Sequence, residues 1–121
     1  MTTKTRFPRR VFQAGDEPDP RFTLANERTF LAWIRTSLAL IAAGVALEAL
    51  ALPLQLGLRL AASIILLALG LVVPPLAWAT WGSVERALRH ATPLPSSKVA
   101  LPLAIGISTV GILLIAGVLL R

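Results

Sequence analysis

Three apolar runs, each about as long as a bilayer is thick, constrain this chain more than any other feature. A helix needs about 20 apolar residues to cross a hydrocarbon core of ~30 Å. The sequence offers such runs at about 30–52, 60–81 and 99–120. Hydrophobic residues make up 55% of the 121 residues and charged residues only 15%, a ratio that a soluble domain of this length could not bury. The sequence therefore predicts an all-α membrane protein with three transmembrane helices.

Residues 1–20 differ in composition from the rest of the chain, being rich in charge and proline. Such a segment cannot form a core, so we expect a mobile cytoplasmic tail. After it, Thr23 is expected to cap a helix that runs without interruption into the first span. The second helix should extend past the bilayer until Pro93 and Pro95 end it. We predict a single three-helix domain over 21–121, with the first and second helices extended into the cytoplasm.

A signal peptide is the competing interpretation of the first apolar run, because small residues at Ala49 and Ala51 resemble a cleavage site. The basic leader before this run is too long for a signal peptide. We therefore expect the run to remain in the protein as a span.

The distribution of lysine and arginine predicts the orientation. The segment up to Arg35 holds seven of them and the second loop holds three, whereas the first loop and the C-terminus hold one each. Basic residues are retained on the cytoplasmic side. We therefore predict a multi-pass protein of the plasma (inner) membrane, with the N-terminus inside and the C-terminus outside. The three tryptophans would then lie near the inner interface, where indole rings are enriched.

Two stripes run along the first helix. Residues seven apart return to nearly the same helical face, so Arg21, Arg28 and Arg35 form one stripe, hereafter the basic ridge. Roughly opposite lies a stripe of small or polar residues, which is expected to contact other helices: Asn26, Trp33, Ser37, Gly44 and Glu48.

Each of these charges also has a purely structural explanation. Arg35 and Glu48 lie close to the two ends of the span, from which long side chains can reach the headgroups. Glu27 and Arg28 could simply be a solvated helix start. Charged groups at a membrane edge nevertheless tend to face a bundle interior or a water-filled path, and rings of arginine line anion and phosphate pores.

The second and third spans carry features typical of helices with neighbours. Pro74 and Pro75 interrupt the backbone donors of the second span, which predicts a kink or, less commonly, a hinge. Glycines along the third span allow close helix approach. Because three helices barely enclose an interior, we predict a homo-oligomer of three to five subunits within the lipid bilayer.

The stretch "DPRFTLANERTFLAWIRTSLALIAAGVALEAL", and "ANERTFLAW" above all, closely resembles the signature of the YidH family of small three-span bacterial membrane proteins. The same motif resembles the transmembrane domain of the vacuolar transporter chaperone complex, whose three-helix units surround a pore that conducts polyphosphate. The resemblance implies pore-side positions at Arg21, Glu27 and Arg28, and a further basic contact at Arg86. The chain holds no soluble polymerase or phosphate-sensing domain, so polyphosphate synthesis is not implied.

Other chemistries find no support in the sequence. Cysteine is absent, and the single histidine, His90, lies in a basic loop, so no metal site or cofactor is predicted. Serines 37, 63 and 83 lack a base at a plausible spacing, so we expect no enzymatic activity. The net charge of +6 follows the pattern of a membrane protein, and we expect no nucleic-acid partner.

Two hypotheses follow. The first is an oligomeric pore or gate for anions, phosphate or polyphosphate among them, with a basic cytoplasmic mouth. The second is a membrane scaffold or accessory subunit that binds anionic lipid or a protein partner. The arrangement of three arginines on one face favours the first.

Overall fold

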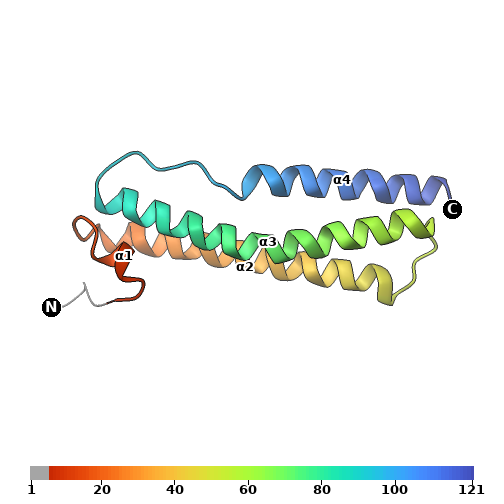
Figure 1. Ribbon diagram of the computed structural model, residues 1–121, viewed down its shortest axis with the longest axis horizontal. Helices are drawn as coiled ribbons and strands as arrows, with labels where there is room; N and C mark the ends of the chain where they lie inside the picture. The colour runs from red at the N-terminus through yellow and green to blue at the C-terminus, as the bar shows by residue number, and fades with distance from the viewer. Residues whose placement is uncertain (1–5) are drawn as a thin grey trace.

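The computed structural model describes residues 6–121. Within that range the regular secondary structure consists of helices, with no strand. A short helix, α1 (Arg9–Phe12), precedes three long ones, which are α2 (Pro20–Ala49), α3 (Leu56–Arg89) and α4 (Ala100–Leu119). All three long helices are long and apolar enough to cross a membrane. The predicted fold class is therefore confirmed. Figure 1 shows the start of α2 and the end of α3 at one end of the molecule, hereafter the basic end, with the C-terminus at the other.

The start of α2 corrects the prediction from the sequence. Asp19, and not Thr23, is the N-cap, and its carboxylate accepts a hydrogen bond from the Arg21 N–H at 2.9 Å. Pro20 occupies the first helical position, where its fixed φ is favourable and its missing N–H is not needed. The Thr23 hydroxyl is consequently free to bond elsewhere, and it donates to Glu85 of α3.

Helix α3 is longer than a bilayer requires and ends earlier than its following prolines suggest. Its 34 residues span about 51 Å, so α3 continues well beyond a hydrocarbon core. It ends at Arg89, not at Pro93, because Ala91 adopts a left-handed conformation with φ 53°. The N–H groups of Ala91 and Thr92 then bond back to the carbonyls of Leu88 and Ala87, which is the Schellman arrangement of a helix end.

Helices α2 and α3 pack antiparallel in a register fixed by two serine–glycine pairs. The Ser37 hydroxyl of α2 donates to the Gly70 carbonyl of α3 at 2.6 Å, and the Ser63 hydroxyl of α3 donates to the Gly44 carbonyl of α2 at 2.6 Å. Both glycines permit close approach, since a Cβ on Gly70 would lie 2.4 Å from Ile41 Cγ1. On each helix the serine and the glycine lie seven residues apart, so both hydrogen bonds can form in one antiparallel register.

The Ser37 bond also explains how α3 tolerates its proline pair. Pro74 has no N–H, so the Gly70 carbonyl four residues earlier loses its helical donor. The Ser37 hydroxyl of the neighbouring helix supplies the replacement. This is how membrane proteins commonly satisfy a carbonyl freed by proline, and the helix runs through the pair as one element.

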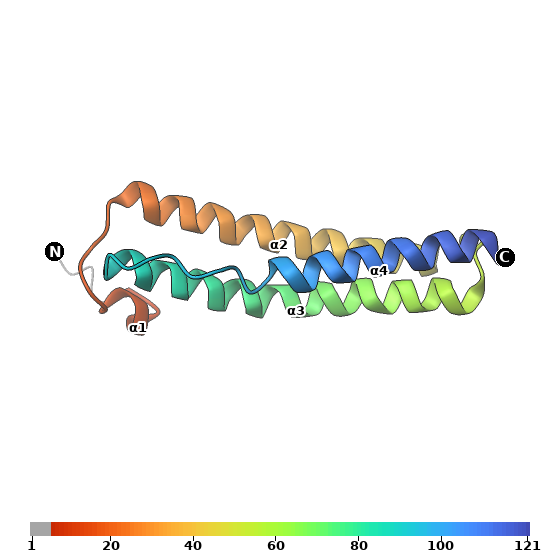
Figure 2. The ribbon, with the colours of Figure 1, turned by 90° about the horizontal axis from the view of Figure 1, so that it is seen from above.

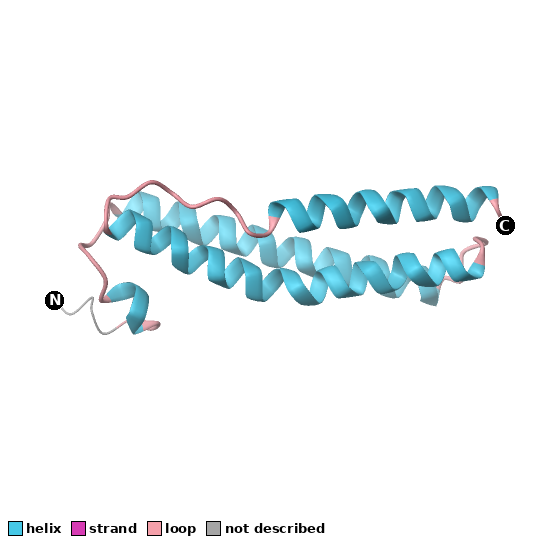
Figure 3. Ribbon diagram, turned by 45° about the horizontal axis from the view of Figure 1, so that its top comes forward, coloured by secondary structure: helices cyan, strands magenta, loops and turns pink. Residues whose placement is uncertain are grey.

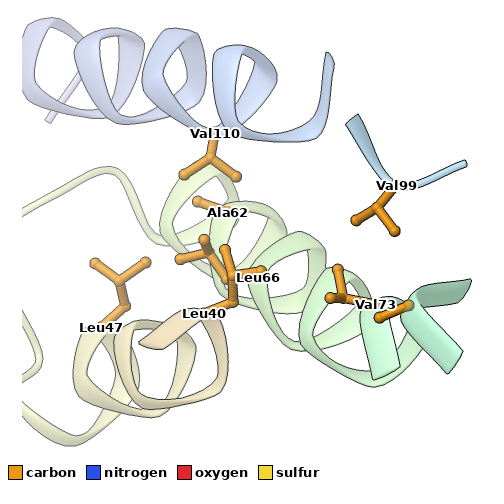
Figure 4. Packing of buried hydrophobic residues seen from close by; sticks show 8 residues of the cluster. Leu40, Leu47, Ala62, Leu66, Val73, Val99 and Val110 are labelled. Atoms are coloured by element: carbon orange, nitrogen blue, oxygen red, sulfur yellow. The ribbon is translucent and has the colours of Figure 1, made fainter. Parts of the chain in front are cut away.

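Helix α4 packs on α3 but not on α2. It lies beside the first half of α3, while the 90–99 linker runs back along the second half of that helix (Figures 1 and 2). Only Val110 and Gly117 of α4 are buried. Figure 4 shows Val110 above Ala62 of α3, with Leu40 and Leu47 of α2 on the far side of α3's core residues. Helix α3 therefore contacts both other long helices, whereas no Cα atom of α4 lies within 8 Å of a Cα atom of α2.

The N-terminal segment differs from the expected mobile tail. In the structure α1 lies against the basic end of the helices (Figure 3), and Val11 and Phe12 are buried against Trp81 of α3. The sequence offers a reason in retrospect, because "VF" is an apolar pair inside a charged segment. The first five residues of the predicted tail lie outside the described residues.

Candidate functional site

A buried charge cluster joins α2 to α3 at the basic end. Glu85 is fully buried and Arg89, one turn later, is 5% exposed. The Thr23 hydroxyl donates to Glu85 Oε2 at 3.0 Å, and the Asn26 amide lies 3.4 Å from Glu85 Oε1 and donates to the Trp81 carbonyl at 3.0 Å. Arg89 Nε lies 3.5 Å from Glu85 Oε2. A buried carboxylate is stable only with such partners, so this cluster fixes how the two helices meet.

The N-terminal segment completes the cluster from the other side. Arg89 donates to the Phe12 carbonyl at 3.0 Å and to Glu17 at 3.1 Å, and its guanidinium lies 4.9 Å from the centre of the Phe12 ring. Gly15 has a φ of 51°, and a Cβ there would lie 2.4 Å from the Arg89 carbonyl oxygen, so the turn requires glycine. The segment is thus attached through Arg89.

Glu17 supplies the negative charge that pairs with Arg6 and Arg89 where the N-terminal segment meets α3. It accepts hydrogen bonds from Arg6 at 2.7 and 2.8 Å as well as from Arg89. The bonds from Arg6 lower the pKa of the Glu17 carboxyl, with a further contribution from the charge of Arg89. The ionised carboxylate is therefore the form that holds the segment in place.

The basic ridge lies on the open face of α2. Arg21, Arg28 and Arg35 are all exposed. Arg21 forms an ion pair with Asp19 at 2.9 Å, and the hydrogen bonds from Arg21 lower the pKa of the Asp19 carboxyl. The side chains of Arg28 and Arg35 form no ion pair or hydrogen bond with another residue of the described range.

Glu27, the neighbour of Arg28 in the sequence, does not pair with it within one chain. It is exposed and has no ion-pair partner among residues 6–121. Glu27 instead lines a cavity of about 350 Å³ beside Phe30 of α2, Trp78 and Trp81 of α3, and residues of the N-terminal segment.

The small and polar stripe of α2 lies toward α3. Asn26, Ser37 and Gly44 are buried there, and Trp33 packs against the apolar core. Glu48 behaves differently, because α2 ends at Ala49 and places this carboxylate at the end of the helix. Glu48 pairs with Arg59 of α3 at 3.2 Å.

Arg86 lies apart from the ridge. It lines a cavity of about 290 Å³ with Arg10 of the N-terminal segment and Lys98 of the linker before α4, and none of the ridge arginines lines this cavity. Sequence reasoning did not connect these three residues, because they are distant in the sequence. The buried Glu85–Arg89 pair was equally missed, although its spacing of four residues on one helix was a usable signal.

No group of three or more potential metal-ligating side chains occurs within residues 6–121. The hydroxyl groups of Ser37, Ser63 and Ser83 all donate hydrogen bonds to backbone carbonyls.

Comparison with known proteins places these features in a family. The family described as Domain of unknown function (DUF202) matches residues 21–87. The chain belongs to the DUF202 family. It is 44% identical over 101 residues to an uncharacterized protein of Mycobacterium tuberculosis, covering 83% of each chain. It is also 62% identical over 42 residues to the Inner membrane protein YidH of Escherichia coli, covering 35% of this chain and 36% of that protein. No solved structure matches.

The expected membership of the YidH family is confirmed, and this DUF202 chain is a multi-pass inner-membrane protein. The matched residues span α2 and most of α3. They include the basic ridge, Asn26, Glu85 and Arg86, whereas Arg10, Arg89 and Lys98 lie outside them.

Proposed function

We propose that this protein assembles into an oligomeric pore or gate for anions, with phosphate or polyphosphate as candidates, and that the basic ridge of α2 lines its mouth. The observation that carries the proposal is the position of Arg28 and Arg35. Both are exposed on the open face of α2 without a counter-charge among the described residues. Arg35 lies within the first span, where an unpaired arginine is costly in lipid and is usually directed to a protein interior or a water path.

The exposed helix faces support an oligomer of three to five subunits. No Cα atom of α4 lies within 8 Å of one of α2, and only Val110 and Gly117 of α4 are buried, so most of α4 remains uncovered within one chain. Copies placed around an axis with the ridge inward would stack Arg21, Arg28 and Arg35 in successive rings. Native mass spectrometry from mild detergent should then give a discrete oligomer, and a monomer in every detergent and in nanodiscs would contradict it.

The proposed mouth lies in the cytoplasm. Ten of the 12 lysines and arginines belong to the N-terminal segment, the ridge and the second loop, and two belong to the other side. Because the chain has no cysteine, single cysteines can be introduced at Gln55 and Ser96. An impermeant thiol reagent should label Gln55→Cys in intact cells and spare Ser96→Cys. The reverse pattern would overturn the orientation.

Ion flux into liposomes tests the pore directly. Replacing two ridge charges with Arg28→Gln/Arg35→Gln should preserve insertion and abolish anion flux and phosphate-chain binding. Arg28→Lys should retain part of the flux and of the binding, because the charge remains while the planar guanidinium fork is lost. Arg9→Gln/Arg121→Gln is the matched control, since it removes two exposed charges away from the ridge.

The alternative is a scaffold role without enzymatic activity, in which the ridge binds anionic lipid or a protein partner. If the wild type conducts no anion while Arg28→Gln/Arg35→Gln still loses lipid or partner binding, the pore is excluded and the scaffold stands.

A further inference from the structure

We infer that the cavity lined by Arg10, Arg86 and Lys98 is a binding site for a phosphate group at the membrane edge. This inference does not depend on the proposed pore, because no residue of the basic ridge takes part.

Three separate segments bring positive charge to this one cavity. Arg10 belongs to α1, Arg86 to the basic end of α3 and Lys98 to the linker that precedes α4. None of the cavity's lining residues is acidic, and none of the three cations forms an ion pair within residues 6–121. Gathering like charges without a counter-charge is unfavourable, and a bound anion would relieve the repulsion.

Two buried or bridging acids at this end are engaged elsewhere. Glu17 is held by Arg6 and Arg89, and Glu85 by Thr23, Asn26 and Arg89. These two carboxylates therefore do not neutralise the cavity. Arg89 and Arg86 lie three residues apart on α3, yet the first is buried and paired while the second is exposed and unpaired.

The cavity has a suitable size and setting for phosphate. Its volume of about 290 Å³ exceeds that of a single phosphate and leaves room for an attached group. Arginine offers a planar fork of donors and lysine a compact charge, and both are common phosphate ligands. Trp78 and Trp81 line the same cavity, and their rings are stacked with centroids 5.1 Å apart. Such indole rings are typical of the headgroup level of a bilayer.

A phosphate group could come from an anionic phospholipid or from a soluble ion, and binding experiments can separate these sources. Purified protein in a neutral detergent should be titrated with short-chain phosphatidylglycerol, with phosphatidylcholine of the same chain length, and with pyrophosphate. Tryptophan emission is the readout, since two of the three tryptophans line the cavity.

We expect saturable binding to the wild type that Arg86→Gln/Lys98→Gln weakens at least tenfold, about the effect of losing one charged hydrogen bond. Arg10→Gln, from a different segment, should weaken the same binding. The matched control is Arg59→Gln/Arg121→Gln, which removes equal charge at the opposite end of the helices and should leave binding unchanged. Circular dichroism verifies that all variants remain helical.

Saturation by phosphatidylglycerol but not by pyrophosphate would support the site and identify lipid as the source, and the opposite result would support the site with a soluble anion. Equal losses in the cavity and control variants would mean unspecific attraction and would overturn the inference. So would the absence of saturable binding to the wild type.

Discussion

The α2–α3 interface carries side-chain hydrogen bonds along its whole length, whereas the α3–α4 interface is held by apolar contacts. Asn26, Ser37 and Ser63 each donate across the first interface to a backbone carbonyl. No side-chain hydrogen bond joins α3 to α4 in the described range. Among the described residues, one backbone hydrogen bond links these two segments, from the Gln55 N–H at the cap of α3 to the Gly117 carbonyl.

The difference matters because lipid supplies no hydrophobic force that would drive apolar helices together. Hydrogen bonds and close glycine contacts can fix a register in that environment, since each has one geometry. Apolar side chains can leave a neighbouring helix and contact lipid instead at little cost in free energy. We therefore regard α2 and α3 as one rigid unit, and α4 as the helix whose surface is available to the subunits of the proposed oligomer.

The largest expected effect is at the end of the α2–α3 interface. Arg89→Ala leaves Glu85 buried without its cation and should lower the free energy of unfolding by about 3–5 kcal/mol. Arg86→Ala is the matched control, because this arginine is exposed on the same helix and should change stability by no more than about 0.5 kcal/mol. Thermal unfolding in detergent measures both. Equal stability of the two variants would contradict the structural role of the buried pair.

A substitution of glycine compares the two interfaces directly. Gly70→Ala places a Cβ 2.4 Å from Ile41 Cγ1 and 3.1 Å from the Ser37 carbonyl oxygen, and should destabilise by about 1–3 kcal/mol. Gly111→Ala in α4 meets nothing within 4 Å. It should be neutral or stabilising by up to about 1 kcal/mol, because alanine favours helix. If Gly111→Ala proves as harmful as Gly70→Ala, other subunits cover α4 closely at that point.

The two serine bonds should differ in strength for a reason given by Pro74. Ser37→Ala leaves the Gly70 carbonyl without a donor and should cost about 1–2 kcal/mol. Ser63→Ala should cost about 0.6 kcal/mol, since the Gly44 carbonyl lies in an uninterrupted helix and keeps its ordinary partner. Combining Ser37→Ala with Pro74→Ala restores an N–H donor. The cost of losing Ser37 should then fall, and a double-mutant cycle with no coupling would refute this explanation.

The sequence was sufficient for the fold class because the length and composition of apolar runs decide membrane insertion. The seven-residue spacings also placed the ridge and the stripe on different faces of α2. Details at helix ends were harder. Thr23 and Asp19 are both good N-caps. Asp19 caps the helix with Pro20 at the first helical position, and the Thr23 hydroxyl donates instead to Glu85, a partner on another helix that the local sequence does not reveal.

The candidate sites were predictable only within one helix. Arg21, Arg28 and Arg35 share a face of α2, so periodicity alone groups them. The cavity of Arg10, Arg86 and Lys98 depends on how α1 and the linker return to α3, and no local pattern encodes that return. The attachment of residues 6–19 was missed for the same reason, because it depends on Arg89 some 70 residues later.

The smallest expected effect concerns that attachment and its response to acid. The fold lowers the pKa of Glu17 through its bonds from Arg6, with Arg89 contributing, so the carboxylate form stabilises the attached segment. This contribution is complete above the ordinary pKa of about 4.5 and is lost as the pH falls through the lower value in the folded protein. Trp81, buried against Val11 and Phe12, should then become more exposed. In a Trp33→Phe/Trp78→Phe background, its emission should shift to longer wavelength below about pH 4.5. Glu17→Gln should already show the shifted emission at pH 7 and no transition in this range. A transition that persists in Glu17→Gln would assign the acid response to another carboxyl group, with Asp19 as the first to test, because Asp19→Asn retains a good helix cap while removing its titration.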